Sequence, residues 1–127
     1  MNIKINFQAS ECLDFQNITT LMYNINKDFI EYIDFYNISS ILKKLQNTNY
    51  KNAFNPKKNY TLVFNPNECN SFLKLVSMSG NLLDSCAYHK AIIIDKCTCI
   101  HAAFSALEHQ KNIFISNQIF NVPKKLN

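Results

Sequence analysis

The stretch AYHKAIIID, residues 87–95, decides the fold that this sequence predicts. Charged and imidazole groups open the segment, three consecutive isoleucines fill its middle, and a carboxylate closes it. A short apolar run that is rich in β-branched residues is typical of a buried strand. We therefore expect residues 87–94 to form a strand in the interior of a sheet.

Strands and helices are predicted to alternate upstream of this segment. Apolar and polar residues alternate over residues 3–7, as in a half-buried strand, and Ser10 is a suitable cap for the helix that follows. Aromatic and β-branched residues predict a second strand over residues 28–36, although the same positions also fit a helical period. The predicted elements after it are a helix over 38–45, a loop over 47–58, a strand over 60–64 and a helix over 68–78.

Downstream of residues 87–95, short strands are predicted over residues 98–100 and 112–116, on either side of a helix over residues 102–109. This alternation argues for an α/β fold, in which helices flank a mixed sheet. A chain of 127 residues is long enough for one hydrophobic core. We therefore expect a single domain over residues 1–120, followed by a short C-terminal tail over residues 121–127.

Composition excludes several classes of protein. Hydrophobic residues make up 47% of the chain and charged residues 17%, which argues against disorder. The net charge of +4 comes from scattered lysines, and no block is long enough to indicate a nucleic-acid-binding arm. No apolar stretch approaches the roughly 18 residues of a membrane-spanning helix, and the first residues lack a signal-peptide pattern. We expect an intracellular, cytoplasmic protein, located in the host cytoplasm if it is viral.

The segment that starts at Tyr88 resembles the phospholipase D signature H-x-K-x-x-x-x-D. Lys90 and Asp95 match the spacing of that motif, whereas Tyr88 stands at the histidine position and His89 falls one residue later. Further on, the family has G-S-x-N where this chain has HAAFS, and Ser105 stands at the asparagine position. The predicted order of strands and helices is also similar to that of compact nucleases of this superfamily.

The resemblance implies a phospholipase D-like fold and a phosphodiesterase or nuclease ancestry. In the family the histidine attacks phosphorus and the lysine holds the phosphate oxygens. On a strand, Tyr88 and Lys90 would share one face and His89 would point to the other. The resemblance therefore implies a pseudoenzyme that retains Lys90 and Ser105 for phosphate contact and binds nucleic acid, another phosphodiester or a protein partner. Family members with one motif pair two subunits, which implies a homodimer with Lys90 near its axis.

Two other interpretations remain open. In the first, the protein is an active, metal-independent phosphodiesterase or nuclease in which a displaced histidine, His89 or His101, replaces the missing nucleophile. In the second, it is a small zinc-binding or interaction protein, because five thiol or imidazole groups fall within sixteen residues. These groups are Cys86, His89, Cys97, Cys99 and His101, of which the last three would share one face of a strand.

Buried, reduced thiols are the simpler interpretation of the cysteines, because their number is odd and the chain shows no secretory signal. We also expect no cofactor. The chain contains one glycine and cannot form a glycine-rich phosphate loop, and it has no dinucleotide signature.

Overall fold

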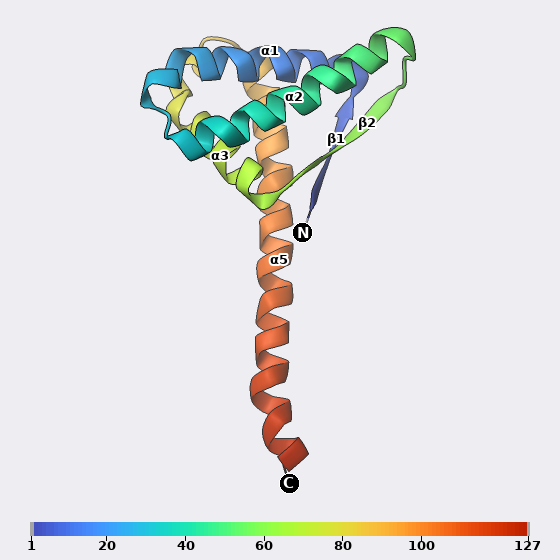
Figure 1. Ribbon diagram of the computed structural model, residues 1–127, viewed down its shortest axis with the longest axis vertical. Helices are drawn as coiled ribbons and strands as arrows, with labels where there is room; N and C mark the ends of the chain where they lie inside the picture. Colours follow the sequence, from blue (N-terminus) through green and yellow to red (C-terminus); the bar gives the residue numbers. More distant parts are fainter. Residues whose placement is uncertain (1, 127) are drawn as a thin grey trace.

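A computed structural model describes the backbone of residues 2–126 and the side-chain surroundings of residues 2–118. A head of packed helices sits at one end of a single long helix, whose C-terminal part projects away from it (Figure 1). In chain order the elements are β1 (Ile3–Gln8), α1 (Ala9–Asn26), the 3-10 turn η1 (Lys27–Phe29), α2 (Tyr32–Phe54), β2 (Asn59–Phe64), α3 (Pro66–Met78), α4 (Gly80–Asp84) and α5 (Ala87–Leu126).

The predicted α/β fold with a mixed sheet is wrong. Helices account for 80% of the chain and strands for 10%, so the protein is mostly helical. The sheet consists of β1 and β2, which pair antiparallel with Ile3 opposite Phe64 and Gln8 opposite Asn59. The strands predicted over residues 3–7 and 60–64 are confirmed, as are the helices predicted after Ser10 and over residues 38–45, 68–78 and 102–109. Ser10 is not the cap of α1, because Gln8 stands at the N-cap position and Ser10 lies within the first turn. The other predicted strands, over residues 28–36, 87–94, 98–100 and 112–116, lie in η1, α2 or α5.

Burial within the isoleucine run shows why residues 87–94 form a helix. Ile92 and Ile94 would share one face of a strand, but Ile92 is buried and Ile94 is 54% exposed. Burial instead recurs at Ile92, Lys96 and Ile100, which is the spacing of one helical face. No glycine or proline interrupts residues 81–122, so nothing in the local sequence ends the helix once it has begun.

The second misassigned region, residues 28–36, is likewise explained by burial at a helical spacing. Residues 28–36 also fit a helical period, and the buried positions of α2 are Asp34, Ile38, Ile41 and Leu45. α2 then runs through most of the predicted loop over residues 47–58. Asn49 is a poor helix former, but its side chain donates to Gln16 Oε1 on α1 at 2.6 Å. Contacts between α1 and α2 therefore extend the helix beyond what local propensity predicts.

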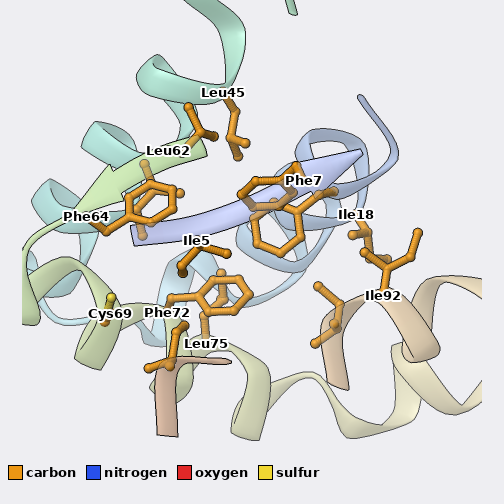
Figure 2. Packing of buried hydrophobic residues seen from close by; sticks show 14 of the residues in the cluster. Ile5, Phe7, Ile18, Leu45, Leu62, Phe64, Cys69, Phe72, Leu75 and Ile92 are labelled. Atoms are coloured by element: carbon orange, nitrogen blue, oxygen red, sulfur yellow. The ribbon is translucent and has the colours of Figure 1, made fainter. Parts of the chain in front are cut away.

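The hydrophobic core lies between the inner face of the β1–β2 ribbon and the helices of the head (Figure 2). Phe15 of α1 contacts Phe7 of β1 edge to face and Phe72 of α3 at a tilt, with ring centroids 5.0 and 5.2 Å apart. Leu45 and Leu62 lie beside each other in the same core (Figure 2), and all five side chains are buried. The ribbon thus contributes one apolar face to a core that is otherwise helical.

A buried lysine fastens α5 to the head. Lys96 is 3% exposed, and its ammonium donates to the backbone oxygen of Asn6 at 2.8 Å. It also forms ion pairs with Glu11 at 2.9 Å and Asp95 at 3.0 Å, and lies 4.7 Å from the centre of the Phe7 ring. Three elements, β1, α1 and α5, therefore meet at one charged group.

The C-terminal part of α5, residues 105–126, is here called the stalk. Among its described side chains, residues 105–118, every one is exposed except Leu107, which is half-buried. The stalk continues α5 without interruption through the predicted strand over residues 112–116 and on to residue 126. None of the described helices is both long and apolar enough to cross a membrane.

Candidate functional site

The motif that resembles phospholipase D lies in the first turns of α5. Each residue of a helix is rotated by about 100° from the one before it, so residues two apart point to nearly opposite sides, and Tyr88 and Lys90 do not share a face. Tyr88 donates through its hydroxyl to Asp14 Oδ2 at 2.7 Å, and Lys90 pairs with Asp84 Oδ1 at 2.6 Å. The strand geometry that aligned Tyr88 with Lys90 is therefore absent.

The surroundings of these residues do not activate a nucleophile. The hydrogen bond to Asp14 raises the pKa of the Tyr88 phenol above its ordinary value, and this disfavours the phenolate. The His89 ring lies beside the Tyr88 ring, with centroids 5.7 Å apart. Asp95 pairs with Lys96 as part of the anchor of α5. Each predicted catalytic side chain thus has a structural contact or lies at the surface.

The predicted phosphate-binding pair is also separated. Lys90 and Ser105 belong to the same helix, and a rise of about 1.5 Å per residue places them about 22 Å apart along its axis. One phosphate group cannot contact both. Lys90 is in addition partly neutralised by the neighbouring carboxylate of Asp84.

The residues of the zinc alternative do not form a ligand set. On a helix, Cys97 and His101 share a face, whereas Cys99 points away from both. No three histidine, cysteine, aspartate or glutamate side chains gather around a possible ion in the described part of the chain. Burial raises the pKa of the Cys97 thiol to about 11, which favours the neutral form over the thiolate that zinc requires.

Three of the predicted site residues line the same groove, and this groove is apolar. Lys90, Cys97 and His101 line one side of an open groove of about 610 Å³ that runs between α5 and the helices α3 and α4. The other side is formed largely by apolar residues, namely Leu73, Val76, Gly80 and Leu83. The groove is therefore lined mainly by apolar side chains.

A second surface lies where α2 ends and β2 begins, and we call it the α2–β2 corner. It consists of Tyr50, Lys51, Phe54, Lys57 and Tyr60, which together line an open cleft of about 410 Å³. The Tyr50 and Phe54 rings lie one helical turn apart, with centroids separated by 4.9 Å. Their planes are inclined by 55°, and the side chains are 69% and 74% exposed, so a contacting pair of tilted aromatic rings faces solvent.

Hydrogen bonds hold the loop of the α2–β2 corner in place. The Tyr60 hydroxyl donates to Asn52 Oδ1 at 2.7 Å and accepts the backbone N–H of Lys57 at 3.2 Å. The backbone N–H of Asn55 donates to the Lys51 carbonyl at 2.8 Å and closes the end of α2. The backbone that carries the lysines is therefore ordered by contacts within the corner.

The corner is also positively charged. No aspartate or glutamate occurs between Phe35 and Asn67, a segment that contains five lysines. Lys44 is engaged by Glu68, but within residues 2–118 Lys51, Lys57 and Lys58 form no ion pair with an acidic group. Lys57 and Lys58 also border an adjoining cleft of about 600 Å³, which reaches residues 8–10 at the start of α1.

The sequence contains a signal for this surface, although the prediction places the segment in a loop and counts its lysines among scattered charges. The signal is the coincidence of an acid-free segment with aromatic residues spaced four apart. The helical assignment of α2 is needed to bring Tyr50 and Phe54 onto one face.

Comparisons with protein-family models, curated proteins and solved structures find no match to this chain. The resemblance to phospholipase D therefore rests on the quoted residues alone. Function has to be argued from the surfaces of the head and of α5.

Proposed function

We propose that this protein binds single-stranded nucleic acid at the α2–β2 corner. The observation that carries the proposal is the exposed, contacting pair of Tyr50 and Phe54 rings, flanked by lysines that form no ion pair with a carboxylate of residues 2–118. Proteins that bind single strands without sequence preference combine these two features, a stacking platform for bases and a positive surface for phosphates.

The two parts of the corner would act on different parts of the ligand. Bases would stack on the Tyr50 and Phe54 rings, whose faces accept any base. Phosphates would lie against Lys51, Lys57 and Lys58, the last two of which also border the adjoining cleft beside residues 8–10. Lysine contributes a point charge and no planar fork, so we expect little discrimination between sequences.

Catalysis is not part of the proposal. Lys90 is paired with Asp84, and Tyr88 is held by a hydrogen bond that disfavours its anion. A phosphodiesterase with a displaced histidine would require an anion-binding group beside that histidine. The charged side chain next to His89 is Lys90, which is already paired with Asp84.

The binding test uses fluorescence anisotropy with a labelled oligothymidylate over a series of salt concentrations. Tyr50→Ala combined with Phe54→Ala should weaken binding about tenfold or more, because stacking contributes roughly 1–3 kcal/mol per base. Lys57→Ala combined with Lys58→Ala should reduce the slope of log affinity against log salt by about 1.4, or about 0.7 for each lost phosphate contact.

Matched controls separate the corner from general effects of charge and aromaticity. Phe29→Ala combined with Tyr32→Ala removes two rings that are equally exposed near the opposite end of α2. Lys111→Ala removes an exposed lysine from the stalk. Both controls should leave the affinity close to that of the native protein. Native protein that does not bind, or corner variants that bind as well as the controls, would refute the proposal.

A further inference from the structure

Residues 105–118 of the stalk project beyond the head and have almost no packing contacts with the described part of the chain. The described side chains of the stalk are almost all exposed, including Ile113, Phe114 and Ile115. Asparagine, serine and β-branched residues are frequent in it, and these are weak helix formers. Helices in proteins owe most of their stability to packing of an apolar face, so a stalk of this composition requires a surface against which to pack.

The groove beside α5 and the stalk belong to one continuous helical face. From α5, the groove is lined by Lys90, Ile93, Ile94, Cys97, Thr98 and His101. Residues seven apart lie on nearly the same side of a helix, so the face of Ile94 and His101 continues on the stalk at Glu108 and Ile115. Ile94 and Ile115 are 54% and 42% exposed, and His101 and Glu108 are exposed as well.

We propose that two copies of this chain associate through antiparallel α5 helices, with the stalk of each copy lying in the groove of the other. One register then pairs Ile94 with Ile115 of the second copy and His101 with Glu108 of the second copy. The four positions are symmetric about the point between Phe104 and Ser105, where the twofold axis would cross the helices. Each pair therefore forms twice, as an isologous interface requires.

Lengths support a second copy as the occupant. At about 1.5 Å per residue, the stalk is roughly 33 Å long and the part of α5 that packs in the head, residues 87–104, is roughly 27 Å long. A stalk can thus span the whole groove of another copy. It cannot reach its own groove, because the stalk and the groove-lining residues belong to one uninterrupted helix.

Charge selects the antiparallel arrangement. A parallel pair of α5 helices in register would place Glu108 opposite Glu108 and His101 opposite His101. The antiparallel register places an imidazole opposite a carboxylate at two positions, which fixes orientation as complementary charges do in paired helices. This axis differs from the one near Lys90 that the phospholipase D resemblance implies, because Lys90 would lie about 22 Å from the centre of the interface.

Oligomeric state in solution is the first test, measured on the full chain by sedimentation velocity over a range of concentrations. The native protein should sediment as a dimer and Ile115→Asp as a monomer, because the change buries a carboxylate in each groove. Ile113→Asp is the matched control, since Ile113 is 48% exposed on the same stalk but points about 200° away from Ile115. A monomeric native protein, or equal dissociation by the two variants, would overturn the proposal.

A charge exchange tests the register. Glu108→Lys removes both imidazole–carboxylate pairs and places a second basic group opposite each His101, so it should raise the dimer dissociation constant about tenfold. Adding His101→Glu to Glu108→Lys restores opposite charges in the same register and should recover dimerisation. Failure of the double variant to recover, with far-ultraviolet circular dichroism unchanged, would show that these positions do not face each other.

Directed cross-linking distinguishes the two orientations. In a Cys97→Ser and Cys99→Ser background, which removes the groove and surface thiols of α5, a mixture of Ile94→Cys and Ile115→Cys proteins should form a mixed disulfide under mild oxidation. Ile115→Cys alone should remain uncross-linked through this position, because its partner residue is Ile94. Efficient self-linking of Ile115→Cys would instead indicate parallel stalks and contradict the antiparallel dimer.

Discussion

Replacing Glu11 should destabilise the head more than replacing the buried lysine with which it pairs. Burial alone would lower the pKa of Lys96, but hydrogen bonds to Glu11 and Asp95 outweigh it and raise the pKa, so the ammonium stays charged in the fold. Glu11→Gln leaves that charge without its less exposed carboxylate partner, since Asp95 is 62% exposed. Breaking a buried pair from one side costs about 3–5 kcal/mol, and the remaining Asp95 reduces the expected cost to about 2–3 kcal/mol.

Lys96→Met removes the charge and retains most of the apolar stem. Its main cost is the lost hydrogen bond to the carbonyl of Asn6, about 1–2 kcal/mol. The double variant Glu11→Gln with Lys96→Met should have a free energy of unfolding close to that of Lys96→Met alone, because the buried ammonium that Glu11→Gln would leave unpaired is no longer present. Urea unfolding followed by circular dichroism gives the four free energies of unfolding and the coupling energy between the sites.

The order in which the variants lose free energy of unfolding tests whether Glu11 holds the Lys96 ammonium. If Lys96→Met loses more stability than Glu11→Gln, or if the coupling energy is below about 0.5 kcal/mol, the ammonium is not held by Glu11 as described. A large loss in every variant with a changed urea dependence would instead indicate altered compactness of one state. Phe7, whose ring lies under the ammonium, serves as an additional probe.

Two further predictions concern groups that titrate. Burial would raise the pKa of Glu68, but hydrogen bonds from Lys44, Asn65 and Ser40 lower it below 4.5 overall. The ionised Glu68 therefore contributes its full stabilisation above pH 4.5, and this stabilisation is lost as pH falls through the lowered pKa. The free energy of unfolding should therefore drop in acid more steeply for the native protein than for Glu68→Gln, and parallel profiles would exclude this contribution. Among the thiols, burial raises the pKa of Cys12 and Cys69 to about 11, so a disulfide reagent at pH 8 should modify exposed Cys99 first, and early loss of either buried thiol would contradict the packing of the core.

The parts of the fold that the sequence predicts correctly are those in which local signals agree. Residues 60–64 have a strand period and are followed by proline and asparagine, and α3 begins with a capping box between Asn65 and Glu68. β1 alternates strictly between buried and exposed residues. In each case period, capping residues and flanking punctuation all indicate one structure, and packing did not have to decide between two.

The failures occur where one sequence fits two periods. The isoleucines of residues 92–94 satisfy a buried strand and a buried helix equally well, and the choice depends on Lys96 reaching Glu11 and Asn6 in distant segments. Those contacts have no local signature, because nothing near Lys96 in the sequence distinguishes a buried lysine from a solvated one. The aromatic and β-branched residues of 28–36 were misassigned for the same reason.

A wrong period alters the predicted chemistry as well as the predicted fold. As a strand, residues 88–95 align Tyr88 with Lys90 and resemble a phosphodiesterase motif; as a helix, they separate those two residues and align Lys90 with Cys97 and His101 along a groove. The extension of α2 into the predicted loop over residues 47–58 likewise brings Tyr50 and Phe54 onto one face and forms the α2–β2 corner. With residues 88–95 in a helix, the proposed anion-binding surface is at the end of α2 instead of at Lys90. The exposed face of α5 is then the surface proposed to bind a second copy of the chain.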